Sequence, residues 1–150
     1  MRNILAICLG LTLLVVPDRS VACSCATFPD IQSFYSNADI VIAAEAIDIF
    51  STPAVANIRG REIKDNSQVV TWEVFESWKG SFEKGQFITT TREAFAGNCT
   101  LPAEKGDVMI LYLYAEEPRV ISMCSGSTSL KRSLRNIPEL YRLSESRNGT

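Results

Sequence analysis

The sequence predicts an all-β domain with flanking helices, stapled by disulfides. Five short apolar segments with strand-like patterns are separated by glycine- and proline-containing turns, a spacing that is typical of a small barrel. Helical spacing is confined to a short stretch near residue 31 and to the C-terminal region. Four of the five cysteines follow the first 22 residues, which indicates two disulfides in an exported protein.

The N-terminal segment has the order of a secretory signal peptide. A short basic start precedes an apolar run over residues 4–16, and Ser20 and Ala22 supply the small residues that a cleavage site needs. The run is shorter than the about 20 residues that span a bilayer. We therefore expect cleavage of residues 1–22, export to the periplasm or the extracellular space, and no transmembrane segment. Lipidation of Cys23 is the alternative, although Ser20 stands where a lipobox prefers a larger apolar residue.

The mature chain is expected to be one monomeric domain over residues 23–145, followed by a short tail at 146–150. Signal removal takes away two of the 15 basic and one of the 17 acidic side chains, which leaves a net charge of −3. That acidic balance argues against a nucleic-acid partner. The remaining length suffices for one hydrophobic core and not for two.

The side-chain chemistry argues against an enzyme. Histidine is absent, so the usual general base, the usual metal ligand and every Ser–His or Cys–His nucleophile are missing. We expect no catalytic residues and no cofactor of the protein's own. Carboxylates are scattered singly over the expected strands and loops, and we interpret them as surface charges: Glu45, Asp48, Glu73, Glu76 and Glu93.

Cysteine pairing is the strongest constraint on the mature chain, which keeps Cys23, Cys25, Cys99 and Cys124. A bond between Cys23 and Cys25 would close a very small, strained ring. Two long-range pairings therefore remain open, and each ties the new N-terminus to the body of the domain. Closing such long loops stabilises a fold by about 3–5 kcal/mol each in the chain-entropy model. A zinc site of four thiolates is the alternative, but the first two cysteines lack the usual C-x(2–4)-C spacing.

The first half of the mature chain predicts a short helix and two strands. Asp30 is placed to cap a helix that carries Ile31, Phe34 and Tyr35 on one face. A mostly buried strand is expected over residues 40–49, with Glu45 and Asp48 facing out, and a second strand over residues 69–78, with Val70, Trp72 and Val74 on one face. The polar, turn-rich segment between them, residues 50–68, predicts a long loop or a projecting hairpin.

Three further strands are expected over residues 86–91, 108–115 and 119–124, and together the five strands predict a barrel. The C-terminal region changes to helical spacing at Leu130, Leu134, Ile137 and Leu140 or Tyr141, with an interruption at Pro138, so a packed and kinked helix is expected. Its basic side chains, Lys131, Arg132 and Arg135, are interpreted as solvated. Aromatic side chains at strand spacing are expected to pack in the core or on the sheet: Trp72, Phe75, Trp78, Phe82, Phe87, Tyr112 and Tyr114.

The order of these features resembles a known family. A Cys23-Ser24-Cys25 start is followed by a short helix that ends in Asn-Ala-Asp-Ile-Val-Ile (37–42), a strand that ends in Trp-Lys-Gly (78–80), and then Cys99 and Cys124. Over residues 23–141 this resembles the N-terminal domain of the tissue inhibitors of metalloproteinases and, more broadly, the netrin-like module. The family cysteine expected after Phe34 is replaced by Tyr35 and the second domain of the animal proteins is missing, so the chain resembles a bacterial member.

The resemblance implies a five-stranded OB-fold barrel and selects the pairings Cys23–Cys99 and Cys25–Cys124. In that family the free amine and the carbonyl of the first mature residue, here Cys23, chelate the catalytic zinc of a metalloendopeptidase. A catalytic zinc keeps an open position for water, and an amine–carbonyl pair can displace that water.

By the same resemblance, the expected partner is a zinc metalloprotease and the contacted metal is the zinc of that protease. The implied inhibitory wedge comprises Cys23, Ser24, Cys25, Ala26 and Thr27, with Ser24 entering the primed-side specificity pocket. The implied ridge beside it comprises Ala96, Gly97, Asn98 and Cys99. The alternative function is a non-inhibitory, netrin-like extracytoplasmic binding module.

Overall fold

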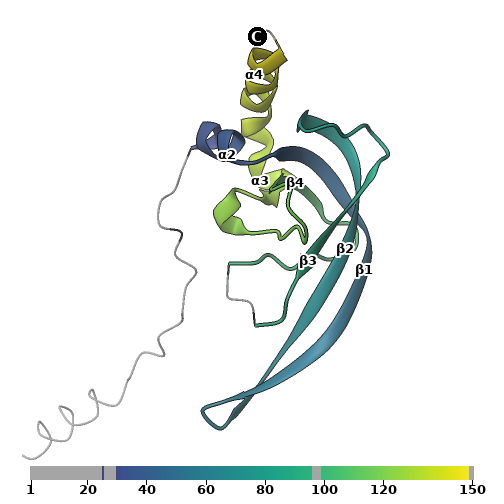
Figure 1. Cartoon of the computed structure of the whole chain (residues 1–150), viewed down its shortest axis with the longest axis vertical. Coiled ribbons are helices and arrows are strands. Elements are labelled where there is room, and N and C mark those ends of the chain that lie inside the picture. Colours follow the sequence, from purple (N-terminus) through teal and green to yellow (C-terminus); the bar gives the residue numbers. More distant parts are fainter. Residues whose placement is uncertain (1–24, 26–29, 96–98, 149–150) are drawn as a thin grey trace, which may run out of the picture.

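The computed structural model describes residue 25, residues 30–95 and residues 99–148. Five strands form one antiparallel sheet: β1 (Ile40–Ile58), β2 (Arg61–Lys79), β3 (Phe87–Arg92), β4 (Val108–Leu113) and β5 (Thr128–Ser129). Their order in the sheet is β3-β2-β1-β4-β5. The helices are α2 (Ile31–Asn37), α3 (Leu130–Ser133) and α4 (Ile137–Asn148), with 3-10 turns η2 (Met123–Ser125) and η3 (Leu134–Asn136) (Figure 1). The mostly β fold class with flanking helices is confirmed.

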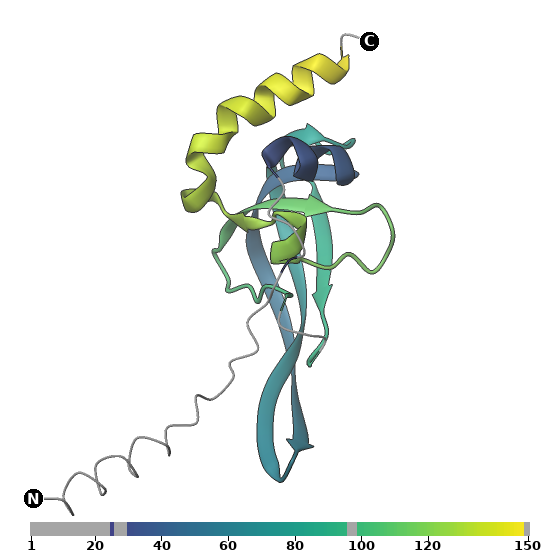
Figure 2. The ribbon, with the colours of Figure 1, turned by 90° about the vertical axis from the view of Figure 1, so that its left-hand side faces the viewer.

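The polar segment between the first two strands forms a projecting hairpin. β1 and β2 stay paired from Val41 and Lys79 as far as Ile58 and Arg61. Arg59 and Gly60 make the turn with φ angles of 53° and 77°, the two positive values that a tight two-residue hairpin turn requires. Figures 1 and 2 show this hairpin extending away from the body, with its tip at the opposite end of the described chain from α4.

Over the described residues, the sheet does not close into the continuous barrel that was predicted. β3 meets the chain beyond β4 through an isolated parallel bridge between Thr91 and Val120, where the Thr91 N–H donates to the Arg119 carbonyl at 2.7 Å. The predicted fifth strand over residues 119–124 is wrong: this segment supplies isolated bridges at Val120 and Ser122 and then turns into η2. The strand that pairs with β4 is instead Thr128–Ser129.

Both faces of the sheet are buried near the start of β1, which explains the nearly continuous apolar run there. Ile42 and Ala44 belong to one core cluster together with Trp72. The alternating residues Val41 and Ala43 belong to a second cluster, which packs beneath α2 and α4. Successive strand side chains point to opposite faces, so this part of β1 separates two cores.

The predicted inner face of β2 is confirmed, because Val70, Trp72 and Val74 are all buried. The Trp72 Nε1–H donates to the Thr90 hydroxyl of β3 at 2.8 Å, which satisfies the one polar atom of the indole. Two of the aromatic side chains expected to pack are exposed instead. Phe87 is 61% and Tyr114 is 57% exposed, because Phe87 points to the outer face of the sheet edge and Tyr114 lies just beyond the end of β4.

The helices cover the second core cluster. Asp30 caps α2 as predicted by accepting a hydrogen bond from the Ser33 N–H at 2.8 Å, and Tyr35 is buried with its hydroxyl donating to the Trp78 carbonyl at 2.7 Å. The C-terminal region is interrupted as predicted, but the interruption is η3 between α3 and α4 and not Pro138. Pro138 lies in the first turn of α4. Backbone N–H groups in a first turn have no acceptor within the helix, so the missing N–H of proline costs no hydrogen bond there.

The packed face of the C-terminal region differs from the prediction at one position. Leu140 is fully buried, whereas Leu134 is 56% exposed. The 3-10 geometry of η3 tightens the chain to about three residues per turn, so the face that continues through α4 is shifted relative to a regular helix.

This difference can be measured by comparing two leucine truncations. Leu140→Ala removes a fully buried side chain from the cluster beneath α4, and we expect the free energy of unfolding to fall by about 2–5 kcal/mol. Leu134→Ala is the matched control and should change it by less than about 0.5 kcal/mol. Urea unfolding of the two variants measures both values, and an equal loss would contradict the observed packing.

Candidate functional site

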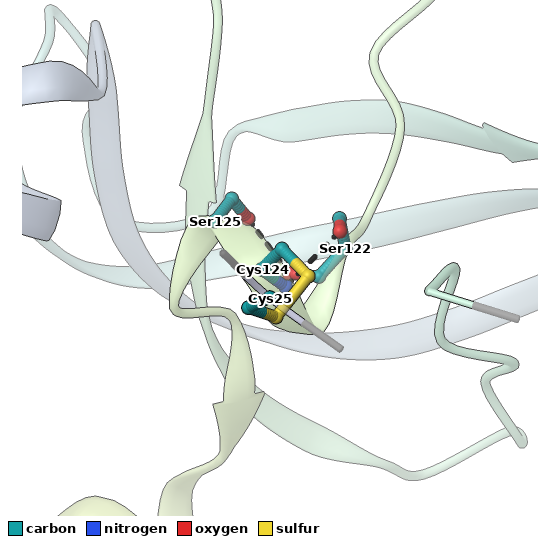
Figure 3. Close-up of a disulfide and its surroundings, with 4 residues drawn as sticks. All are labelled: Cys25, Ser122, Cys124 and Ser125. Atoms are coloured by element: carbon teal, nitrogen blue, oxygen red, sulfur yellow. Dashed lines mark hydrogen bonds between the residues drawn. A yellow bond between two sulfur atoms is a disulfide. The ribbon is translucent and has the colours of Figure 1, made fainter. Parts of the chain in front are cut away.

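The cysteines of the predicted site are brought together by a disulfide between Cys25 and Cys124 (Figure 3). Their Cα atoms lie 5.4 Å apart and the bond joins residues separated by 99 positions. This is the pairing that the resemblance implies. It excludes the other long-range arrangement, in which Cys25 would bond to Cys99 and Cys23 to Cys124. Cys99 is also disulfide-bonded; its predicted partner, Cys23, lies outside the described residues.

Cys99 and Cys124 lie on neighbouring segments. The Met123 N–H donates to the Cys99 carbonyl at 2.9 Å, and the Leu101 N–H donates to the Ile121 carbonyl at 3.1 Å. An antiparallel bridge between Thr100 and Ser122 lies between these two hydrogen bonds. The chain that follows the predicted ridge is therefore paired with the chain that leads to Cys124.

The turn η2 holds Cys124 through its own serines. The Ser122 hydroxyl accepts a hydrogen bond from the Cys124 N–H at 3.1 Å, and the Ser125 hydroxyl donates to the Ser122 carbonyl at 2.8 Å. Figure 3 shows both serines beside the disulfide. Gly126 ends the turn with a φ of 94°, in the left-handed region where glycine is strongly favoured.

A close approach of Gly126 to α2 fixes this turn against the body. A Cβ atom on Gly126 would lie 2.5 Å from Cγ of Phe34, so only glycine fits beneath that ring. The Phe34 ring packs in turn on Tyr112 of β4, with the ring centroids 5.7 Å apart. Cys124 therefore lies on a turn that contacts α2, and the Phe34 ring connects that turn to β4.

The chain that leads into the ridge is anchored to β2 by Asp65. Its carboxylate accepts a hydrogen bond from the Phe95 N–H at 3.0 Å and pairs with the Arg92 guanidinium at 2.9 Å and 3.2 Å. The backbone hydrogen bonds from Phe95 and Asn66, together with the one from Arg92, lower the pKa of Asp65 to about 2. The carboxylate is therefore ionised throughout the physiological range.

A neighbouring contact strengthens this anchor, since the Ala94 N–H donates to the Ser67 hydroxyl at 3.0 Å. The described residues nearest residues 96–98 are thus held, Ala94 and Phe95 by β2 and Cys99 by its pairing with the chain before Cys124.

Of the predicted wedge and ridge, the structure describes Cys25 and Cys99. The other predicted residues lie outside the described part of the chain: Cys23, Ser24, Ala26, Thr27, Ala96, Gly97 and Asn98.

Sequence reasoning missed the residues that position the site, above all Asp65, Arg92 and Gly126. Gly126, two residues after a cysteine, carried a weak turn signal. The acidic and basic pair carried none, because Asp65 and Arg92 are 27 positions apart and meet only through the pairing of β2 with β3.

The described residues contain no group of three or more acidic, histidine or cysteine side chains that could hold a metal ion. Cys25 and Cys124 are bonded to each other, so they do not form the alternative site of four thiolates. In the same part of the chain, no helix is long and apolar enough to cross a membrane.

A scan of the chain against models of known protein families finds no match, and a search among curated proteins finds none either.

The anchoring role of Asp65 predicts a pH-dependent loss of stability in Asp65→Asn. The folded-state pKa of about 2 lies below the ordinary aspartate value of 3.8, so the stabilisation is complete above pH 4 and disappears as the pH falls toward 2. We expect the variant to lose about 1–2 kcal/mol at pH 7 and progressively less below pH 4. Urea unfolding across that range measures this, with the exposed Asp48→Asn as a control. A loss that does not change with pH would contradict an ionic anchor.

The fit beneath Phe34 predicts that Gly126→Ala destabilises the turn by both backbone strain and a clash. Gly85 provides the matched control, because its φ of 85° is similar and a Cβ atom added there would have no other atom within 4 Å. Gly85→Ala should lower the free energy of unfolding by about 1–2 kcal/mol, and Gly126→Ala by about 1–3 kcal/mol more. Thermal unfolding of the two variants compares them, and equal losses would show that the Phe34 contact does not constrain the turn.

Proposed function

We propose that the protein is a secreted inhibitor of zinc metalloendopeptidases, and that the free N-terminal amine and the carbonyl of mature Cys23 chelate the catalytic zinc of the protease. The observation that carries the proposal is the disulfide between Cys25 and Cys124. Consecutive Cα atoms are about 3.8 Å apart, so Cys23 lies within about 8 Å of the tethered Cys25. A ligand so close to a fixed point loses little conformational entropy on binding.

The chemistry of the N-terminus fits the open site of a catalytic zinc. An amine and a carbonyl of one residue form a compact pair of ligands that can replace the zinc-bound water. The amine coordinates only when neutral, and its reference pKa of about 7.7–8.0 leaves a minor neutral fraction at pH 7. Zinc binding must therefore expel a proton, and inhibition should strengthen as the pH rises toward 8.

The anchored flanks of the ridge support the proposed geometry around that ligand. In this proposal Ser24 enters the primed-side pocket, Ala26 and Thr27 lie along the cleft, and Ala96, Gly97 and Asn98 flank them. Phe95 and Cys99 at the two sides of the ridge are held by β2 and by the chain before Cys124.

The wider proposal is a netrin-like variant of the OB-fold, exported and cleaved after Ala22. The parallel bridge between Thr91 and Val120 supports it, because it links the edge strand β3 to the chain beyond β4, the direction in which a barrel would close. A long-range disulfide is typical of an oxidising compartment outside the cytoplasm.

A non-inhibitory extracytoplasmic binding module is the second candidate. The projecting hairpin favours it, because Phe50, Val55, Ile58 and Ile63 are large apolar side chains that are 40–69% exposed. Exposed apolar groups on one projecting element are typical of a binding surface.

The chelation mechanism is tested by extending the N-terminus by one residue. The processed protein, starting at Cys23, and a form with one alanine before Cys23 are assayed against a panel of zinc endopeptidases. The extension converts the amine into an amide that cannot coordinate zinc, so we expect inhibition to weaken by at least about 100-fold, or about 2.7 kcal/mol. An alanine added at the C-terminus is the control and should have no effect.

The possible outcomes separate the two candidates. Equal inhibition by the processed and extended forms would refute chelation by Cys23. Inhibition by neither form would favour the binding module.

A further inference from the structure

The tip of the β1–β2 hairpin, residues 54–64, carries chemistry that the proposed inhibition does not use. It is the part of the described chain farthest from the helical end, and Figures 1 and 2 show it extending beyond the sheet. An element that projects in this way can reach a flat surface while the body stays in solution.

One face of the tip carries two exposed isoleucines beside Arg61. Ala56 pairs with Ile63 and Ile58 pairs with Arg61 across the two strands. Ile58 is two residues after Ala56 and so lies on the same face of the hairpin as Ala56 and its partner Ile63. The side chains of Ile58 and Ile63 are 49% and 40% exposed. Val55, which is 62% exposed, pairs with Lys64 on the opposite face.

The tip is also basic in a chain that is acidic. It holds three of the 15 basic side chains and one of the 17 acidic ones, a net charge of +2, so the rest of the chain totals −4. Lys64 forms an exposed ion pair with Glu62 at 3.3 Å. The ion pairs found among the described residues do not include Arg59 or Arg61, so these two cations are available to a partner.

We propose that this tip docks on anionic phospholipid bilayers, with Arg59 and Arg61 on the lipid phosphates and Ile58 and Ile63 at the acyl boundary. Clustered cations are attracted to anionic lipid, and apolar side chains beside them bury into the interface. A bilayer fits better than a protein or a nucleic acid, because residues 54–64 contain no aromatic side chain. Protein interfaces concentrate energy in aromatic anchors, and single-stranded nucleic acids stack on them.

The docking does not depend on inhibition, since it uses neither Cys23 nor the ridge. It is peripheral binding at the surface of the bilayer.

The experiment is sedimentation of the mature protein with two kinds of vesicle, phosphatidylcholine alone and phosphatidylcholine mixed with phosphatidylglycerol. We expect binding to the mixed vesicles, at least about tenfold less binding to phosphatidylcholine alone, and loss of binding at about 0.5 M salt. Equal binding to both lipids, or binding to neither, would overturn the proposal.

Two pairs of variants then locate the contact, after circular dichroism has shown that each is folded. Arg59→Glu with Arg61→Glu should weaken binding at least about tenfold, whereas the charge-matched control Arg132→Glu with Arg135→Glu should change it less than about threefold, because those exposed arginines lie at α3 and η3. Ile58→Ser with Ile63→Ser should weaken it about tenfold or more, and Val55→Ser much less. Equal effects of the tip variants and their controls would overturn the assignment.

A fluorescence reporter distinguishes insertion from simple charge attraction. The native tryptophans, Trp72 and Trp78, are buried and give a constant background. Ile58→Trp should show a blue shift when mixed vesicles are added, and Val55→Trp should not. If the tip variants instead changed only protease inhibition, with no vesicle binding by the parent protein, the hairpin would be a protein contact and the bilayer proposal would be wrong.

Discussion

The contact between the Phe34 ring and Gly126 is the constraint on which the candidate site depends. It joins α2 to the turn that carries Cys124, and Phe34 also packs on Tyr112 of β4. The disulfide then transfers this rigidity to Cys25. An N-terminal segment by itself would have many conformations, and fixing one residue costs about 1–2 kcal/mol in backbone entropy. For Cys25, the disulfide to Cys124 supplies that restriction within the fold itself.

The burial of β1 on both faces stabilises the position of α2 against the sheet. Val41 and Ala43 face the helices, whereas Ile42 and Ala44 face the other core. α2 therefore packs on one face of β1, and the core cluster that β1 shares with β2 and β3 lies on the other face. Close-packed interiors have low compressibility and transmit strain, so movement on one face is resisted on the other.

Features that depend on residues close together in the chain could be predicted from the sequence. Asp30 caps its helix through a neighbour three residues away, and Val70, Trp72 and Val74 follow the two-residue period of a strand. Cysteine counting narrowed the disulfides to two arrangements, and the resemblance selected the Cys25–Cys124 bond that the structure contains. The fifth strand was predicted wrongly because residues 119–124 have strand-like composition, but Ser122 caps the turn η2 and Gly126 ends it. The prediction that Leu134 is packed was wrong for a similar reason. The 3-10 segment η3 shifts the positions of side chains around the helix axis, so Leu134 is exposed.

The ion pair at the base of the ridge could not be predicted, because it depends on strand register. Asp65 lies opposite Ala54 in the hairpin, and Arg92 reaches it from β3. The same carboxylate also accepts a hydrogen bond from the Phe95 N–H. Asp65 therefore connects the projecting hairpin to the loop that leads to Cys99. If the hairpin tip rests on a surface, the same contact sets the orientation of the ridge relative to that surface. The two proposed activities would then be joined by geometry, although neither requires the other.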